Sequence, residues 1–422
     1  MKILFIVKSK KMENLGVMYL AAVAKKNGAM AKICSLEESR TVAHEWLPDV
    51  LGFSCMTGDQ DRMMKKNSVI KNMWPKGTPE PKTIFGGPHP TFFPKDFNND
   101  PDIDMVVDGE AENWLNGFLG YGIGRMEYLD DIPWPDRTDF PDMLIRDFIA
   151  TRGCPGKCSY CYNARWLEMY PSDKVIRYRS AKDVVDEVRF VNPPFAYFQD
   201  SCFGVSLKWL KEFCKKYESL VIPFHCHMRP NQVTEERVNL LANVNCASIR
   251  IALESASGRL RKLMRRSKLA KEETIQASRI LKKYRPGCQP ISLMVQNMLA
   301  VPTSTIEDDL ETLEFNIRLR PDYAWCSIYS PYPGTELGDY CVEHFLFDGN
   351  YSRVTDSFFD RSLLNFKEEY IEQTYFLQKI FHLCVEVGYM PDPKELNAAD
   401  FPMLIHKIVR KQGDRRLYRG II

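Results

Sequence analysis

Short apolar runs alternate with amphipathic segments through the first 125 residues. The apolar runs cover residues 3–7, 30–34, 50–54, 83–85 and 103–107, and helical patterns at Val17–Lys26 and Asp61–Met73 lie between them. Continuous apolar runs of this length are typical of buried parallel strands. The alternation predicts a doubly wound α/β (Rossmann-like) domain with a ligand crevice at the carboxyl ends of its strands.

A second series of strand and helix patterns follows. Strands are expected near 147–151, 195–199, 222–226, 248–253, 291–296 and 324–329, with helices near 181–190, 207–217, 234–242, 271–284 and 306–319. Six such units predict a partial (β/α)6 barrel that is open on one side and binds ligands at its C-terminal mouth. From about residue 340 the pattern becomes helical. An amphipathic stripe there predicts core packing: Ile371, Tyr375, Leu377, Phe381 and Cys384.

Two prolines within Asp130–Arg137 force an extended path, so this stretch is interpreted as a linker. The predicted organisation is therefore an amino-terminal α/β domain at 1–128, a linker at 129–145, a partial barrel at 146–338 and a small helical region at 339–422.

The composition sets limits on the environment and partners. The formal net charge is +2 and the charges are interspersed, so neither nucleic acid nor membrane is an expected partner. A secretory signal and an 18-residue apolar stretch are both lacking, which predicts a soluble, cytoplasmic protein. In that compartment 13 cysteines argue against a disulfide framework. One basic cluster is interpreted as a solvated face or a binding surface: Lys407, Arg410, Lys411, Arg415, Arg416 and Arg419.

The strongest chemical signal is a loop with three closely spaced thiols, Cys154, Cys158 and Cys161. Three thiolates at this spacing can hold three corners of an iron–sulfur cubane and leave the fourth iron open to a substrate. Pro155 and Gly156 keep the loop irregular, so the sulfurs can converge. The alternatives are a zinc site, which would require a second cysteine pair of the usual kind, or inert thiols.

Glycine-rich loops follow three strands of the amino-terminal domain, at Ser54–Gly58, Gly86–Thr91 and Asp108–Glu110. Glycine lets a backbone approach a ligand closely, but it also makes tight turns. Both interpretations remain open from the pattern alone.

The CxxxCxxC loop, with Tyr160 before its last cysteine, resembles the signature of the radical S-adenosylmethionine (SAM) superfamily. The resemblance implies a 4Fe-4S cluster whose open iron chelates SAM, anaerobic chemistry, a 5′-deoxyadenosyl radical, and an electron donor such as a ferredoxin or flavodoxin. It also implies a set of SAM-binding residues: Tyr160 through its backbone, and Gln199, Asp200, Arg250, Glu254 and Ser255.

The glycine loops, with Pro133–Arg137 and Pro331–Leu337, are similar in kind and order to the cobalamin-binding radical SAM methyltransferases. This resemblance implies a set of cobalamin-binding residues: Ser54, Thr57, Gly86, Gly87, His89, Gly109 and Glu110. The cobalt-ligating histidine that many cobalamin domains carry is missing from the loop at Lys8–Gly16. His89 could replace it or could bond its own loop. His225 and His227 are expected to point to opposite faces of one strand and so not to share a metal.

The implied function is cobalamin-dependent C-methylation of an unactivated sp3 carbon, while the residues that act directly in catalysis are not identified. The compact plan resembles the enzymes that methylate a glutamine of methyl-coenzyme M reductase, so the expected substrate is a protein or, alternatively, a small molecule that is methylated or cyclised. Aromatic residues that could present a protein surface, or only pack, are Tyr351, Phe358, Phe359 and Tyr418. A methylthiotransferase would need three amino-terminal cysteines, and only Cys34 and Cys55 are present there. A cobalamin-binding sensor is the non-enzyme alternative.

Overall fold

The computed structural model describes residues 1–419 except 121–127, 170–175, 268, 270, 284, 286 and 356, with side chains described as far as residue 411. The chain forms two compact units. Unit 1 comprises Met1–Gly153, Arg165–Tyr197 and Tyr351–Asp356, and unit 2 comprises Cys154–Ala164, Phe198–Asn350 and Ser357–Ile422. Each unit is described by itself below.

The amino-terminal sheet of unit 1 has five parallel strands in the order β2-β1-β3-β4-β5. They are β1 (Lys2–Val7), β2 (Met30–Ser35), β3 (Val50–Ser54), β4 (Lys82–Gly86) and β5 (Met105–Val106). The predicted doubly wound sheet is confirmed. The strand order reverses between β1 and β3, which is where ligands bind in sheets of this kind.

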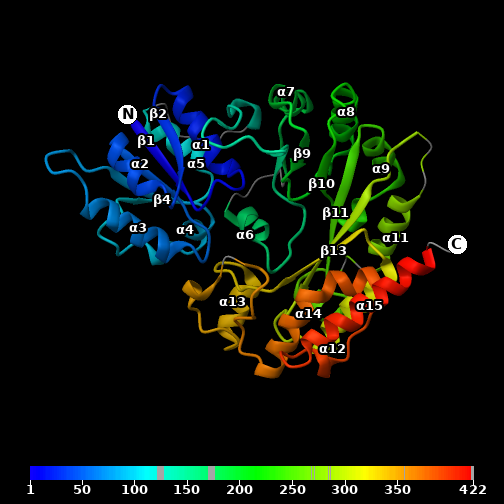
Figure 1. Cartoon of the computed structure of the whole chain (residues 1–422). Coiled ribbons are helices and arrows are strands. Elements are labelled where there is room, and N and C mark those ends of the chain that lie inside the picture. The colour runs from blue at the N-terminus through cyan, green and yellow to red at the C-terminus, as the bar shows by residue number, and fades with distance from the viewer. Residues whose placement is uncertain are drawn as a thin grey trace. The chain divides into compact units, whose positions relative to one another are not determined.

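Helices cover both faces of this sheet (Figure 1). They are α1 (Leu15–Lys26), α2 (Ser39–Trp46), α3 (Gln60–Asn72), α4 (Pro88–Phe92) and α5 (Ala111–Phe118). Alternate residues of β1 define the two layers, because Phe5 packs with α1 and α5 whereas Ile6 packs with α2 and α3. Helix α2 was not predicted, since only Ser39 and Ala43 of its eight residues are buried.

The segment interpreted as a linker is extended, but it packs into unit 1. Ile132 lies in the core beside α1. Arg137 forms ion pairs with Glu13 at 2.5 Å and with Glu187 at 3.0 Å. Glu187 lies on α7 (Ala181–Val191), so the segment joins the loop after β1 to a helix that is much later in the chain. A small antiparallel pair, β7 (Thr151–Arg152) with β8 (Arg177–Tyr178), was not anticipated.

The second sheet has six strands in the order β13-β12-β11-β10-β9-β6, as the partial barrel requires. The strands are β6 (Ile145–Phe148), β9 (Phe195–Phe198), β10 (Phe224–His227), β11 (Cys246–Glu254), β12 (Ser292–Leu299) and β13 (Tyr323–Ile328). The pairs from β10 to β13 are parallel. The intervening predicted helices are present as α7, α8 (Leu207–Tyr217), α9 (Glu235–Ala242), α11 (Lys271–Lys282) and α12 (Ile306–Leu319). Two shorter helices, α6 (Tyr162–Met169) and α10 (Gly258–Leu263), were not predicted.

The carboxyl-terminal helices are α13 (Glu336–Glu343), α14 (Glu368–Val387) and α15 (Phe401–Arg419). Leu377, Phe381 and Cys384 of α14 are buried against α12 and β13, as the stripe predicted. Ile371 and Tyr375 are only half-buried, so the stripe is narrower than expected.

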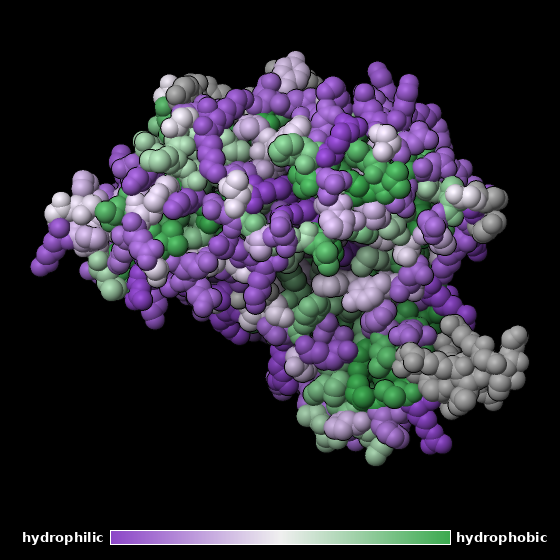
Figure 2. All heavy atoms as spheres, turned by 45° about the horizontal axis from the view of Figure 1, so that its top comes forward, coloured by the Kyte–Doolittle hydropathy of each residue, from purple (hydrophilic) through white to green (hydrophobic). Residues whose placement is uncertain are grey.

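The aromatic residues singled out in this part of the chain have different environments. Tyr351 is buried and its ring packs on Phe93. Phe359 packs on Trp325, whereas Phe358 is half-exposed. The side chain of Tyr418 is outside the described part of the chain. Among the described helices none is both long and apolar enough to cross a membrane. The face shown in Figure 2 is mainly hydrophilic, with separate hydrophobic patches.

Candidate active site

The cysteine loop begins directly after β7 and runs into α6. Cys158 is buried, Cys154 and Cys161 are half-buried, and none is in a disulfide. Each sulfur accepts a hydrogen bond from a different N–H donor. The Gly156 amide lies 3.4 Å from Cys154 Sγ, an Arg266 guanidinium nitrogen 3.4 Å from Cys158 Sγ, and the Asn163 amide 3.5 Å from Cys161 Sγ. Donors of this kind orient cysteine ligands and tune a bound iron–sulfur cluster.

The donor set fits a cluster better than a single ion. Burial raises the pKa of the Cys161 thiol; Asn163 opposes this, while the nearby sulfurs of Cys158 and Cys154 raise it further. Among the described residues no three His, Cys, Asp or Glu side chains meet closely enough to hold one metal ion. A cubane offers a separate iron to each thiolate, so its three ligands can be further apart. Three thiols with N–H donors match that requirement.

A buried polar group beneath the loop holds it to the end of β11. The Tyr160 hydroxyl donates to Glu254 Oε1 at 2.8 Å, and Arg266 lies 3.3 Å from the same hydroxyl. Burial raises the pKa of Glu254 although Arg266 opposes the shift, and burial and Glu254 together raise the pKa of Tyr160. The Ser159 amide and hydroxyl donate to the carbonyls of Met264 and Leu263. These hydrogen bonds join the cysteine loop to Glu254, Leu263 and Met264, which lie about 100 residues later in the chain.

Several of the SAM-binding residues expected from the sequence are turned into the protein. Glu254 is 3% exposed and bonded to Tyr160, so its side chain supports the cysteine loop. Ser255 is buried, and its hydroxyl lies 3.4 Å from Thr312 Oγ1 of α12. Asp200 is fully buried, whereas Gln199 beside it is half-buried. The side chains of Glu254, Ser255 and Asp200 are therefore buried in this structure, and their contact with SAM stays a prediction.

Arg266 is a site residue that the sequence did not reveal. It is 5% exposed and contacts both Cys158 and Tyr160. It lies more than 100 residues after the cysteines, in a basic stretch that reads like a solvated surface. No spacing rule connects it with the loop, and only the fold does so.

The expectation for the two histidines of β10 was wrong. Residues two apart on a strand share a face, and the ring centroids of His225 and His227 are 5.2 Å apart. Burial, His227 and Arg250 lower the pKa of His225 to about 3, and burial and Arg250 lower the pKa of His227 to about 4. Both rings are therefore neutral at pH 7.

The glycine loops of unit 1 are bonded to one another at the carboxyl ends of β3, β4 and β5. The Cys55 amide donates to the Gly86 carbonyl at 2.8 Å, and the His89 amide donates to the Cys55 carbonyl at 3.1 Å. The Gly109 amide donates to Thr91 Oγ1 at 3.0 Å. Gly87 has φ 99° and ψ −174°, a conformation essentially restricted to glycine. The resulting surface is backbone-rich, which suits close approach by a large cofactor.

Two of the predicted cobalamin-binding side chains are occupied by protein partners. His89 is fully buried, with Nδ1 3.0 Å from Thr57 Oγ1 and Nε2 2.9 Å from Asp96 Oδ2. Burial lowers its pKa although Asp96 opposes the shift. Glu110 pairs with Arg177 and Arg152. Because both ring nitrogens of His89 are hydrogen-bonded to protein side chains, His89 supports its own loop and is not placed to ligate cobalt. The Glu110 carboxylate is likewise held by its two arginine partners. Ser54, Gly86 and Gly109 are half-buried at the strand ends.

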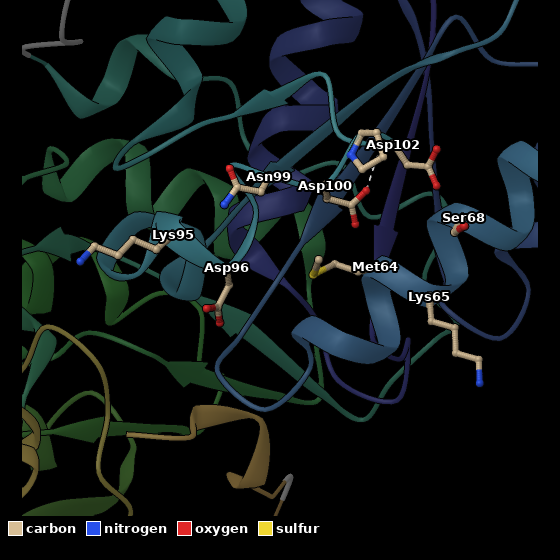
Figure 3. A pocket seen from close by; sticks show the side chains of 9 residues that line it. Met64, Lys65, Ser68, Lys95, Asp96, Asn99, Asp100 and Asp102 are labelled. Atoms are coloured by element: carbon tan, nitrogen blue, oxygen red, sulfur yellow. Dashed lines mark hydrogen bonds between the residues drawn. The ribbon is translucent and has the colours of Figure 1, made fainter. Parts of the chain in front are cut away.

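A separate depression in unit 1 has a volume of about 510 Å³. Figure 3 shows the side chains that line it, from α3 and from residues 95–102. Lys65, Lys95, Asp96, Asp100 and Asp102 give it both signs of charge. None of the residues proposed for cobalamin lines it, and only Asp96 connects it to them, through His89.

Family models match both parts of the chain. The B12 binding domain matches residues 1–119, and the radical SAM superfamily matches residues 148–315. The two matches include the glycine loops and the three-cysteine loop respectively. The cofactors are accordingly cobalamin, a 4Fe-4S cluster and SAM.

Individual proteins with the same arrangement are similar over most of the chain. An uncharacterised methyltransferase of Pyrococcus horikoshii is 24% identical over 379 residues, covering 79% of each chain. The structure is similar to the radical SAM methyltransferase TsrM of Kitasatospora setae, with a TM-score of 0.65 at 15% identity over 81% of this chain and 76% of that one. The fold is thus that of a cobalamin-dependent radical SAM protein.

A tRNA-2-methylthio-N(6)-dimethylallyladenosine synthase of Thermotoga petrophila is 28% identical, but only over 43% of this chain and 42% of its own. The amino-terminal cysteines here do not resemble ligands of a second cluster. Cys34 and Cys55 are buried in the sheet core, where burial raises both thiol pKa values, that of Cys34 to about 12. Two buried thiols cannot supply three ligands, so the methylthiotransferase alternative is not supported.

Proposed function

We propose that this chain, which belongs to the cobalamin-binding radical SAM methyltransferase family, methylates an unactivated sp3 carbon of its substrate. The observation that carries the proposal is the three-thiol loop, in which every sulfur accepts an N–H hydrogen bond, on the same chain as a backbone-rich cobalamin crevice. A sensor that only bound cobalamin would have no use for such a loop.

In the proposed reaction the cofactors supply radical generation and the methyl group, and the protein supplies position and protection from water. Cys154, Cys158 and Cys161 hold the cluster, and Arg266 and Asn163 fix two of the sulfurs. The Tyr160–Glu254 hydrogen bond keeps the loop at the end of β11. The half-buried Gln199, directly after β9, is a proposed SAM contact, together with the Tyr160 backbone.

The proposed cobalamin contacts are the loop backbones at Ser54–Gly58, Gly86–Gly87 and Gly109. Thr57 and His89 act beneath them by fixing the loop after β3 to the loop after β4. Glu13, in the loop where many relatives have a cobalt ligand, is instead held by Arg137 and Arg146. Because Lys8–Gly16 contains no histidine, this loop would supply no imidazole to a bound cobalamin.

For the substrate we propose a glutamine side chain in a protein, on the model of the enzymes that modify methyl-coenzyme M reductase. This proposal is supported by the compact domain plan, in which only a short helical region follows the barrel. The second candidate is a small molecule, which is favoured by the similarity to TsrM, whose structure contains tryptophan as substrate. A ferredoxin or flavodoxin is the proposed electron donor.

The test is anaerobic reconstitution with cluster and cobalamin, followed by mass spectrometry. SAM with a trideuterated methyl group would be offered with a glutamine peptide from methyl-coenzyme M reductase, with the matching asparagine peptide, and with tryptophan. A mass increase confined to the glutamine peptide supports the proposal, and one confined to tryptophan supports the second candidate.

Cys158→Ala is the matched negative control, because two thiolates cannot hold the cluster. We expect it to lose cluster absorbance and 5′-deoxyadenosine formation and to retain bound corrinoid. Undiminished 5′-deoxyadenosine from this variant would contradict the cluster assignment, independently of which substrate is methylated.

A further inference from the structure

The six-stranded sheet has one core face and one face that is not packed into the core. Along β11, β12 and β13, buried residues that face the core alternate with less buried residues that face the other way. We call the other face the inner face. Its residues on β10 to β13 include His225, His227, Ser248, Arg250, Met294, Gln296 and Trp325.

Strand register places these residues side by side. His227 is paired with Arg250 and Arg250 with Met294 across neighbouring strands, and Gln296 is paired with Trp325 one step further along. Paired residues of parallel strands lie on the same face of a sheet. The inner face therefore brings one cation, two imidazoles, an amide and an indole into a single neighbourhood.

Arg250 is unusual among the arginines of this chain. Arg266, Arg152 and Arg179 each contact a carboxylate or a thiol. Within the described part of the chain, the Arg250 guanidinium has no hydrogen bond and no ion pair, and its Nε is buried without a partner. The residue as a whole is half-buried. A partly buried cation without a counter-charge loses hydration without compensation, so this arrangement is expected where a ligand supplies the missing charge.

Within the described part of the chain, the groups known to lie beside Arg250 are aromatic or neutral. The guanidinium lies 5.8 Å from the centroid of the Trp325 ring, which forms an aromatic wall beside it. His225 and His227 are neutral at pH 7, and Arg250 contributes to keeping them so. The Gln296 amide makes no side-chain hydrogen bond within the described residues and remains available as a donor. Such a site favours a planar or tetrahedral oxyanion, which a guanidinium can bind with two parallel hydrogen bonds.

The position of Arg250 separates it from the cysteine loop. The loop is anchored at Glu254 and beyond, and Arg250 lies four residues earlier on the same strand. At about 3.3 Å per residue this is roughly 13 Å down the strand. Arg250 is thus well separated along β11 from the residue that anchors the cysteine loop, and the SAM contact predicted for it is tested separately below.

We propose that Arg250, with Trp325 and Gln296, binds an oxyanion of the methyl-accepting substrate on the inner face of the sheet. This inference rests on the proposed function and adds a substrate class to it. The oxyanion belongs either to a free small-molecule acid or to an acidic residue close to the target carbon in a protein.

The experiment is calorimetric titration of the reconstituted holoenzyme at low ionic strength. The probes are inorganic phosphate, glutarate and the peptide acetyl-Gly-Glu-Gly-amide, each titrated into wild type, Arg250→Gln and Arg318→Gln. Arg318 is the matched control, because it is 75% exposed on α12 and pairs with Glu314. We expect at least one probe to bind wild type, its Kd to rise at least tenfold in Arg250→Gln, and its Kd to stay within twofold in Arg318→Gln. Tighter binding of glutarate would indicate a free acid, and tighter binding of the peptide would indicate a protein substrate.

Two further measurements keep the test decisive. Because Arg250→Gln removes a charge without a partner, its melting temperature should equal or exceed that of wild type, so loss of probe binding cannot be attributed to unfolding. Its Kd for SAM should stay within twofold of wild type. Unchanged probe affinity in Arg250→Gln, lack of probe binding by wild type, or loss of SAM affinity instead of probe affinity would each overturn the inference. A wild-type holoenzyme that binds the probes but forms no 5′-deoxyadenosine would contradict the proposed function and leave the oxyanion site standing.

Discussion

At the scale of single residues, the loop surface proposed to bind cobalamin depends most clearly on Gly87. A Cβ built on this glycine would lie 2.9 Å from the Cys55 carbonyl oxygen and 3.0 Å from its amide nitrogen, and φ is 99°. Both the close approach of two loops and the backbone conformation therefore require glycine. A large side chain at Gly87 would disturb the loops themselves before it met any cofactor.

We predict that Gly87→Ala loses bound corrinoid and retains the iron of the cluster, as measured by absorbance and iron analysis after reconstitution. The matched control is Gly77→Ala, since Gly77 has a similar φ of 82° but nothing within 4 Å of the added Cβ. Backbone strain alone costs about 1–2 kcal/mol, and the control should therefore keep its corrinoid. Equal corrinoid loss in both variants would show that strain, and not loop contact, decides binding.

Arg266 leads to a prediction about the cluster. Its buried positive charge lies against Cys158 Sγ and favours the reduced, more negative state of a bound cluster. We predict that Arg266→Gln lowers the cluster reduction potential by roughly 50–150 mV, on the scale of a charge interaction at an effective dielectric of about 20. Paramagnetic resonance during a redox titration measures it, and Arg266→Lys should restore most of the potential. An unchanged potential in Arg266→Gln would indicate that the residue is only structural.

How much of the site could be predicted depends on how local its signal is. The three cysteines proposed as cluster ligands lie within eight residues of one another, so their spacing alone predicts that role. The contacts of Glu254 and Arg266 with the cysteine loop could not be predicted, because they depend on the path of the chain after β11. The positive φ of Glu254, 68°, is likewise set by tertiary packing. The error at His225 and His227 was different in kind, since strand periodicity itself puts both on one face.

At the scale of elements, α12 and α14 enclose a buried acid. Asp309 is 1% exposed, accepts a hydrogen bond from the Tyr370 hydroxyl at 2.7 Å, and has its pKa raised by burial to about 8. The folded state therefore holds a proton that the unfolded state releases near pH 4. Stability conferred by this part of the protein should fall as pH rises from about 4 to 8, because the unfolded state binds fewer protons across that window.

We predict that the thermal unfolding temperature of wild type decreases as pH rises from 5 to 8, and that Asp309→Asn removes most of this slope. Asp308→Asn, one residue earlier, is the contrasting control. Burial would raise the pKa of Asp308, but its hydrogen bonds with Ser257 and Thr305 and the charge of Arg259 lower it. Its contribution to stability is fully present above about pH 4 and is lost as pH falls below that value, so its variant should leave the slope between pH 5 and 8 intact. A slope that persists in Asp309→Asn would mean that other groups cause it.

Elements with a buried face were predictable, and elements without one were not. The long strands and helices of the second sheet were located to within a few residues because apolar residues recur at strand or helix spacing. β5 was expected over 103–107, but its assigned strand is only Met105–Val106, although the flanking Asp104 and Val107 amides still donate to carbonyls of β4. α2 and α6 bury few or no residues, so their periodicity carried no signal.

At the scale of the whole molecule, the compact units do not follow the order of the chain. Unit 1 takes in Arg165–Tyr197, and with it α7, although the pattern of alternating elements places α7 in the barrel series. Periodicity reports which elements form but not which unit each joins, and long-range ion pairs within a unit leave no periodic trace. In unit 1 these centre on Glu187, which is buried and contacts Arg137 and Arg179.

Glu187 provides the test of that network. Removing its charge leaves two buried guanidinium groups with one fewer counter-charge each, and breaking a buried pair of this kind typically costs about 3–5 kcal/mol. Asp186, the preceding residue of α7, pairs with Lys182 and Arg189 near the surface, where a pair contributes about 1 kcal/mol or less. We predict that Glu187→Gln lowers the free energy of unfolding in urea by about 3 kcal/mol and that Asp186→Asn changes it by less than about 1 kcal/mol.

Because Glu13 and Glu187 share Arg137, Glu187→Gln should also loosen the loop after β1, which proteolysis within Lys8–Gly16 would detect. Equal effects of the two substitutions would show that α7 is held to unit 1 by its apolar face, and that the buried charges are not what assigns it there.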